Sequence, residues 1–227
     1  TKIPLGQLQN NERELLTDLE KNLQTKIVGQ NQALSQVANL IRRSRTNVAD
    51  TDKTLASFLF LGHSGVGKTE TAKQLAKLLF QDAKALIRVD MSEFAEGFTV
   101  SRLIGAPAGY VGYRDNNKFT DLVRRKPYSV VLLDEIEKAH SEVFNILLQV
   151  LEDGHLTDGT GRQINFKNTI IIMTANIGLE EFNQAARLGF AAEHHEPANF
   201  AAAEASVRRD LNRHFRQEFL NRIDNII

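Results

Sequence analysis

One stretch decides the fold of this chain: Gly62-His63-Ser64-Gly65-Val66-Gly67-Lys68-Thr69. It follows an apolar run at residues 57–61 and opens a helical pattern at residues 68–80. Between a strand and a helix, this spacing of glycines before lysine and threonine is typical of a loop that binds nucleotide phosphates. Backbone NH groups and the helix N-terminus attract the phosphates, Lys68 reaches the β and γ phosphates, and Thr69 binds Mg²⁺. We therefore predict a site for a nucleoside triphosphate with Mg²⁺.

Apolar runs alternate with helical patterns along the rest of the chain. The runs are short and mostly continuous, which suits strands buried on both faces of a parallel sheet. Alternating strands and helices predict an α/β fold, with a doubly wound, mostly parallel five-stranded sheet flanked by helices. We predict strands at residues 57–61, 85–89, 129–133 and 169–173 and at the C-terminus, and helices at residues 11–27, 30–45, 68–80, 117–125 and 142–151.

The composition limits the partners of the protein. In 227 residues, 28 basic side chains balance 28 acidic ones, so no overall field steers the chain towards nucleic acid or an anionic membrane. The apolar runs are far shorter than the ~20 residues that a membrane-spanning helix needs. The chain has no cysteine, which excludes disulfides, zinc-thiolate sites and thiol nucleophiles. We predict a cytoplasmic protein with neither nucleic acid nor membrane as a partner.

Two acidic residues follow another buried run. Asp134 and Glu135 come directly after residues 130–133, at the carboxyl edge of the predicted sheet, where open α/β folds bind ligands. We predict that Asp134 binds Mg²⁺ through water and that Glu135 orients and polarises the attacking water, so that the nucleotide is hydrolysed. Two solvated acids at a strand end are the alternative. Asn176 ends the next run and is a candidate for contact with the γ-phosphate, or else the N-cap of a helix that begins near Leu179.

Several motifs occur together and in order. Beside the phosphate loop and Leu-Leu-Asp-Glu-Ile-Glu-Lys-Ala-His at residues 132–140, they are Val89-Asp90-Met91-Ser92-Glu93-Phe94, Gly109-Tyr110-Val111-Gly112 and Phe219-Leu220-Asn221-Arg222-Ile223-Asp224. From around Ile27 to the C-terminus, the chain resembles the second AAA+ domain of the Clp-type unfoldases and disaggregases. The resemblance implies the AAA+ P-loop NTPase fold and ATP as the nucleotide.

The resemblance assigns roles to residues of the nucleotide site. Lys68 and Thr69 match the family's first nucleotide-binding motif, and Asp134 and Glu135 match the second. Asn176 matches the residue that senses the γ-phosphate, although the family usually has Thr-Ser-Asn where this chain has Thr-Ala-Asn. These assignments agree with the roles predicted from the residues themselves.

Further roles follow from the resemblance alone. Arg222 matches the arginine finger, which reaches the nucleotide of the neighbouring subunit and stabilises charge on the transferred phosphoryl group. A surface arginine paired with Asp224 or Glu218 is the alternative. Ile27 and Val28 match the segment that packs on adenine, although apolar residues there also suit a plain core.

Residues 105–113 contain three glycines and a proline around Tyr110 and Val111. No stable helix fits this composition, so we predict an exposed loop. In the family this is the pore loop, whose aromatic residue grips an extended polypeptide in the central channel of a ring. A tyrosine packed back against the domain is the alternative. Residues 152–162 are similar to a second, more polar pore loop.

The tripeptide Leu188-Gly189-Phe190 lies where unfoldases that dock on the Clp peptidase carry an aliphatic residue and a glycine followed by phenylalanine or leucine. Exposed apolar side chains on both sides of a glycine suit an apolar pocket on a partner. A helix C-cap glycine, with Phe190 folded back, is the alternative.

The resemblance also implies the domain organisation and the function. We predict a linker and helix at residues 1–26 and the large AAA+ ATPase subdomain at residues 27–227; the family's helical lid is absent and would follow Ile227. The predicted function is ATP hydrolysis that drives unfolding and threading of unfolded or tagged proteins through a homo-hexameric ring, feeding the Clp peptidase. A stand-alone disaggregase is the alternative, and a nucleic-acid-associated AAA+ remodeller is a more distant one.

Overall fold

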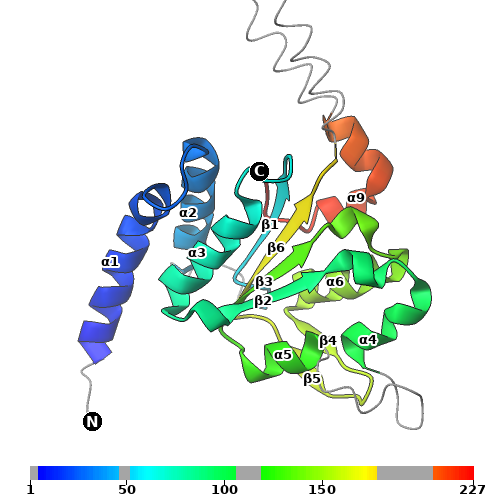
Figure 1. Cartoon of the computed structure of the whole chain (residues 1–227). Helices are drawn as coiled ribbons and strands as arrows, with labels where there is room; N and C mark the ends of the chain where they lie inside the picture. Colours follow the sequence, from blue (N-terminus) through cyan, green and yellow to red (C-terminus); the bar gives the residue numbers. More distant parts are fainter. Residues whose placement is uncertain (1–4, 46–51, 106–118, 178–206) are drawn as a thin grey trace, which may run out of the picture.

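The computed structural model describes residues 5–45, 52–105, 119–177 and 207–227, and the side chains from residue 14 onwards in these ranges. A five-stranded sheet in the order β2-β3-β6-β1-β7 forms the centre of the molecule (Figure 1). Its strand pairs are parallel, which confirms the predicted doubly wound α/β fold. The strands are β1 Ala56–Leu61, β2 Leu86–Asp90, β3 Ser129–Asp134, β6 Thr169–Ala175 and β7 Asn225–Ile226.

Helices cover both faces of this sheet, with α1, α2 and α3 on one face and α4, α5, α6 and α9 on the other (Figure 1). The first helix begins at Leu5, earlier than predicted, because the four-residue spacing of leucines from Leu15 onwards is not continued at Asn11. Among the described helices, none is long and apolar enough to cross a membrane. The helices with both ends in the described residues are α1 Leu5–Gln24, α2 Asn31–Arg45, α3 Lys68–Phe80, α4 Ser101–Ile104, α5 Phe119–Arg125, α6 Ser141–Asp153 and α9 Gln217–Leu220, with short 3₁₀ helices at Ala83–Ala85, Met91–Phe94, Gly97–Thr99 and Ile136–Lys138. Residues 207–214 are also helical.

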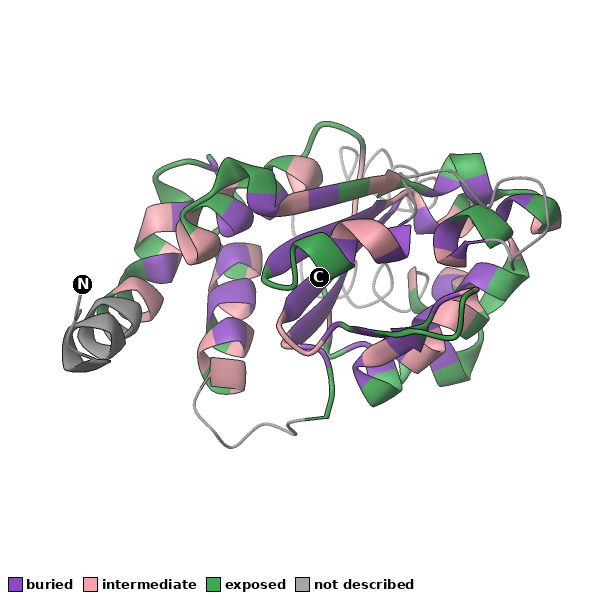
Figure 2. Ribbon diagram, turned by 90° about the horizontal axis from the view of Figure 1, so that it is seen from below, coloured by how far each residue is buried: buried purple, intermediate pink, exposed green. Residues whose placement is uncertain are grey.

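Side chains on the strands alternate between two apolar clusters. Phe58 and Phe60 of β1 pack in a cluster with α1, α2 and α3, whereas Leu59 between them belongs to the cluster that contains α5, α6 and α9. All three side chains are at most 6% exposed, as expected for a strand covered on both faces. Figure 2 shows these buried strands as a layer between the helices.

The parallel register brings three strand ends to one edge of the sheet. Leu61 at the end of β1 pairs with Ala175 at the end of β6, and Leu133 of β3 pairs with Met173 of β6. The N–H of Gly62 also donates a hydrogen bond to the Ala175 carbonyl, at 3.3 Å. The loops that follow β1, β3 and β6 therefore meet at the carboxyl edge.

An antiparallel hairpin of β4 (His155–Thr157) and β5 (Gln163–Asn165) lies where the sequence predicts a polar loop. Its strands are too short for an alternating pattern to reveal them. Gly154 makes the turn from α6 into the hairpin with a φ of +62°, and a Cβ at this position would collide with the Asp52 carbonyl oxygen. Glycine is therefore required at this turn.

The hairpin loop is organised by the carboxylate of Asp158, which is 8% exposed. Its oxygens accept hydrogen bonds from the N–H groups of Thr160 and Arg162, the Thr160 hydroxyl and Arg162 Nε, at 2.6 to 3.0 Å. Burial raises the pKa of Asp158, but these bonds and the Arg162 charge outweigh it and lower the pKa from 3.8 to about 2. The N–H of Gly159 also bonds to the Ile104 carbonyl at 2.9 Å, which joins the loop to the end of α4.

Asp158→Asn should lower the free energy of unfolding by about 2 kcal/mol near neutral pH, because the pKa of Asp158 falls from 3.8 to about 2 on folding. Since the folded pKa is the lower one, this contribution is complete above 3.8 and is lost as the pH falls through about 2. Urea unfolding followed by circular dichroism across this range measures the difference.

The wild-type and Asp158→Asn stabilities should converge in acid. Asp121→Asn, which removes a carboxylate paired with Arg124 on α5, is the matched control. A difference between wild type and Asp158→Asn that stays constant from neutral to acid pH would contradict this account of the loop.

Candidate active site

The loop from Gly62 to Gly67 turns the chain from β1 into α3. Gly65 and Gly67 have φ angles of +86° and +104°, which residues with a side chain rarely adopt. Lys68 is the first residue of α3, and the N–H groups of the first turn of a helix have no partner within it. The carboxyl edge of the sheet therefore presents a helix N-terminus with partial positive charge, which suits a phosphate group.

Lys68 connects this loop to the end of β6. Its Nζ donates hydrogen bonds to the carbonyls of Gly62 and His63, the latter at 3.1 Å, and to Oδ1 of Asn176 at 2.9 Å. Partial burial lowers the pKa of Lys68, and nearby carboxylates, chiefly that of Glu137, offset this only in part. Lys68 and Asn176, predicted from separate motifs, thus lie in direct contact.

Asp134, the last residue of β3, is held from two sides. Oδ1 accepts a hydrogen bond from the Thr174 hydroxyl of β6 at 2.5 Å, and Oδ2 accepts from Nη2 and Nε of Arg88 at 2.7 and 3.1 Å. The Asp134 side chain is 13% exposed, and a carboxylate at this depth needs such partners. Because Arg88 belongs to β2, three neighbouring strands meet at one carboxylate.

Glu135 follows in the left-handed region, with φ +56° and ψ +51°. This conformation is costly for a residue with a side chain and is found mainly where the surroundings enforce it. The N–H of Glu135 donates to the Thr174 hydroxyl at 3.1 Å, and its carboxylate pairs with Lys138 Nζ at 2.5 Å. Thr174 thus supports both predicted acidic residues through one hydroxyl group.

Asn176 is held at its backbone as well as at its side chain. Its N–H donates a hydrogen bond to Oε1 of Glu137 at 3.1 Å, while its Oδ1 accepts from Lys68. The second oxygen of Glu137 is buried and has no hydrogen-bond partner in the described part of the chain. Glu137 therefore positions Asn176; the helix that Asn176 was alternatively predicted to cap lies outside the described residues.

These groups line a pocket of about 380 Å³. The loop N–H groups and Lys68 suit phosphates, and the oxygens of Thr69 and Asp134 are the ligand type that Mg²⁺ prefers. The residues present therefore fit a magnesium nucleotide. Of the residues predicted from the sequence, eight line this pocket: Ser64, Gly65, Gly67, Lys68 and Thr69 of the loop, and Asp134, Glu135 and Asn176 at the strand ends.

Other predicted nucleotide contacts lie beside this pocket. Ile27 is buried, and its Cγ2 would lie 3.7 Å from a Cβ placed on Gly67, so it supports the loop from behind. Val28 next to it is 98% exposed. His63 contributes its carbonyl to the bond with Lys68, and Val66 is exposed.

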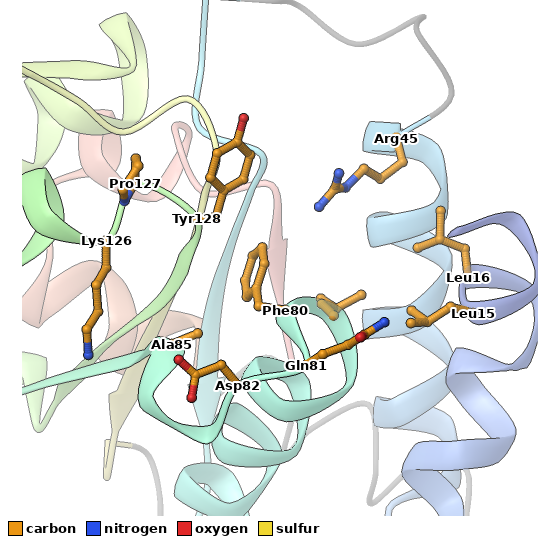
Figure 3. Close-up of a pocket in the computed structure, with 11 residues that line it drawn as sticks. Leu15, Leu16, Arg45, Phe80, Gln81, Asp82, Ala85, Lys126, Pro127 and Tyr128 are labelled. Atoms are coloured by element: carbon orange, nitrogen blue, oxygen red, sulfur yellow. The ribbon is translucent and has the colours of Figure 1, made fainter. Parts of the chain in front are cut away.

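A larger pocket of about 590 Å³ lies away from the phosphate loop (Figure 3). Leu15 and Leu16 of α1, Phe80 at the end of α3 and Tyr128 before β3 line it, with the basic side chain of Lys126 at its side. Its described lining includes none of the predicted active-site residues. Size alone therefore does not identify the active site in this fold.

Arg222 follows α9 and does not appear in the described lining of the phosphate pocket. Its Nη2 pairs with Oε1 of Glu152 at the end of α6, at 2.6 Å, and its side chain is 39% exposed. The alternative partner Asp224 instead accepts hydrogen bonds from the N–H and hydroxyl of Ser57, at 2.8 and 2.7 Å. The ion pair suggested for Arg222 from the sequence is thus replaced by one with Glu152.

Comparison with known proteins connects this geometry to a family. The family model for the AAA domain (Cdc48 subfamily) matches residues 53–226. The chain belongs to this AAA domain family. Over all 227 residues, this AAA domain is 50% identical to the chaperone protein ClpB of Oceanobacillus iheyensis and 49% identical to the ATP-dependent Clp protease ATP-binding subunit ClpC of Staphylococcus epidermidis. It spans 28% of the length of each of these relatives.

A solved structure agrees with these relatives. A closed-state cryo-EM reconstruction of Hsp104 with ATPγS and FITC-casein matches this AAA domain with a TM-score of 0.82 and 44% identity, over 99% of this chain and 37% of that one. The predicted resemblance to a Clp-type AAA+ domain is thereby confirmed. Because the identities to ClpB and ClpC are nearly equal, they do not distinguish a chaperone from a protease subunit.

Two predicted segments lie outside the described residues: the pore loop with Tyr110 and Val111, and the tripeptide Leu188-Gly189-Phe190. Their roles stay predictions.

Several residues of the site carried no separate prediction from the sequence, among them Arg88, Thr174 and Glu137. Arg88 is a charged residue inside the apolar run at residues 85–89, and this irregularity is a usable signal. Thr174 and Glu137 lie in motifs of this AAA domain, yet their contacts with Asp134 and Asn176 depend on how the strands pair. Only the fold reveals those contacts.

Thr174→Val should lower the free energy of unfolding by about 1–3 kcal/mol, because the hydroxyl that bonds both Asp134 and the Glu135 N–H is removed from a buried position. Valine keeps the shape of threonine, so packing changes little. Urea unfolding measures the loss. Thr174→Ser, which keeps the hydroxyl, should retain most of the stability, and an equal loss in both variants would refute the role of the hydroxyl.

Proposed function

We propose that this AAA domain hydrolyses ATP with Mg²⁺ as the cofactor. The observation that carries the proposal is the convergence of Lys68, Asp134, Glu135 and Asn176 in one pocket beside a helix N-terminus. Lys68 and the loop N–H groups bind the phosphates, and Asn176, which is bonded to Lys68, contacts the γ-phosphate or the attacking water. Glu135 orients that water once its carboxylate leaves Lys138.

Thr69 and Asp134 are the proposed holders of Mg²⁺. When bound, Mg²⁺ supplies positive charge that offsets the charge on the transferred phosphoryl group. The Thr174 hydroxyl keeps the Asp134 carboxylate oriented towards the pocket. Ile27 and Val28 are proposed to contact adenine; the nearly full exposure of Val28 supports this, because an apolar base would cover it.

Arg222 is the proposed link between subunits. It lies apart from the phosphate pocket of its own chain, and more than a third of its side chain is exposed. An exposed guanidinium can therefore meet a nucleotide bound to a neighbour. Repeated contacts of this head-to-tail kind close into a ring, and we propose a homo-hexamer in the full-length protein.

We propose that the ring uses ATP hydrolysis to unfold polypeptides and thread them through its centre. Residues 27–227 would form the large ATPase subdomain and residues 1–26 the linker and helix. Tyr110 and Val111 would grip unfolded or tagged proteins, and the FITC-casein in the Hsp104 reconstruction supports a polypeptide as the substrate. We propose a cytoplasmic location, and Leu188-Gly189-Phe190 as the contact with the Clp peptidase.

A mixture of two inactive variants tests the shared ATPase site. Glu135→Gln and Arg222→Ala should each bind ATP but lose at least about 100-fold in turnover, since one lacks the water-orienting group and the other the finger. Mixed in equal amounts, the two full-length variants should regain up to about a quarter of wild-type turnover. An active interface needs an intact Glu135 in one subunit and an intact Arg222 in its neighbour, and each is present in half of the subunits. Steady-state phosphate release measures this.

Arg216→Ala, on an exposed arginine before α9, is the control and should retain wild-type turnover. If Glu135→Gln still hydrolyses ATP at the wild-type rate, the proposed ATPase site is wrong. Failure of the mixture to regain activity would instead reject the placement of Arg222 in a neighbouring site.

A degradation assay tests the partner. The full-length protein with the Clp peptidase should degrade a tagged, folded substrate. Replacement of Leu188-Gly189-Phe190 by glycine and serine should abolish this degradation, because a few local anchor residues supply most of the energy of docking. The ATPase activity of this variant should stay within about twofold of wild type. Wild type that rescues aggregates without degradation would favour the disaggregase alternative. Stimulation of its ATPase by DNA but not by unfolded casein would favour the nucleic-acid remodeller.

A further inference from the structure

Arg88 lines the phosphate pocket but has no part in the roles assigned above. It lies in β2 between the apolar residues Ile87 and Val89. Its side chain is 55% exposed, and the strand that carries it is an edge strand of the sheet. A charged side chain at this position on the sheet therefore faces the site where the nucleotide is proposed to bind.

The guanidinium of Arg88 neutralises Asp134. Two of its nitrogens bond Oδ2, and the Thr174 hydroxyl bonds Oδ1, so both oxygens of this largely buried carboxylate have donors. Opposite charges in a partly buried site attract far more strongly than in water, and a buried carboxylate without a cation is costly. In the empty site, Arg88 supplies the positive charge that Asp134 needs.

The same carboxylate is the proposed Mg²⁺ holder, so Arg88 and the metal compete for it. A guanidinium at hydrogen-bond distance repels a divalent cation and uses the lone pairs of Oδ2. Arg88 has another class of partner within its reach, since its planar fork matches phosphate oxygens as well as a carboxylate. Lys68, by contrast, is tied to three acceptors and partly buried.

We propose that Arg88 exchanges partners when the nucleotide enters: it holds Asp134 in the empty site and passes to the nucleotide phosphates, which leaves Asp134 free to take up Mg²⁺. This inference rests on the proposed nucleotide site. The exchange makes Asp134 a poor metal ligand until a phosphate is present to receive Arg88. Metal and nucleotide therefore bind together, and the metal alone binds weakly.

The first test is the binding of Mn²⁺ alone to the protein. Electron paramagnetic resonance of the free ion, at low ionic strength, measures this binding. Arg88→Gln removes the competing charge, so nucleotide-free protein should bind Mn²⁺ about tenfold more tightly than wild type. Arg88→Lys keeps the charge and should stay close to wild type. Arg124→Gln is the matched control, because Arg124 is a similarly exposed arginine in an ion pair with Asp121, outside the pocket.

Binding of a fluorescent ATP analogue in the presence of a chelator is the second test. Without metal, Arg88→Gln should bind the nucleotide about tenfold more weakly than wild type, because the phosphates lose a charge-assisted contact. With Mg²⁺ the loss should be smaller. Thermal melting of each variant by circular dichroism shows that it is folded, and Arg88→Lys preserves the comparison if Arg88→Gln does not fold.

The outcomes separate this inference from the proposed function. Tighter Mn²⁺ binding together with weaker metal-free nucleotide binding in Arg88→Gln supports the exchange. If either affinity matches that of Arg124→Gln, the exchange is refuted even though the wild type binds ATP. If wild type does not bind ATP with Mg²⁺ at all, the proposed function itself fails.

Discussion

The parallel pairing of β1 with β6 is the constraint on which the rest of this domain depends. Its register runs from Ala56 opposite Ile170 to Leu61 opposite Ala175. Both strands are buried, so their backbone groups must pair with each other rather than with water. A slip by one residue would send Phe58 and Leu59 into the wrong apolar clusters. Core packing, more than any polar contact, therefore places the phosphate loop beside the end of β6.

Once the strand ends meet, the polar groups there satisfy one another. Lys68, Arg88 and Lys138 each have a polar partner inside the site before any ligand enters. A ligand must replace existing bonds, and a purely anionic or purely cationic one would leave half of them unpaired. A magnesium nucleotide carries both signs and can replace both kinds. The contacts are Lys68 with Asn176, Arg88 with Asp134, and Lys138 with Glu135.

Local signals explain what the sequence predicted well. The continuous apolar runs identify the strands of the large sheet because burial on both faces leaves few polar positions. The phosphate loop and the Asp134-Glu135 pair are each contiguous, so their place at strand ends followed from the strands alone. Lys68 and Asn176 were predicted separately, and the sheet order brought them into contact.

Contacts between distant segments were not predictable in the same way. The partner of Arg222 is Glu152, on a different helix, whereas the sequence suggested neighbours in the chain. Arg88 reaches Asp134 because β2 is adjacent to β3, which an alternating pattern does not specify. The β4–β5 hairpin was not predicted because each strand has three residues, of which only the central one is buried, and this is too few to form a recognisable alternating pattern.

The bond from Gly159 to the Ile104 carbonyl has a mechanical consequence. It ties the end of α4, immediately before the segment that contains Tyr110, to a loop that Asp158 stiffens. A pulling force applied beyond Ile104 would be shared between the covalent chain and this second anchor. The hairpin would then transmit part of this force to α6 and β6, which precede and follow it in the chain.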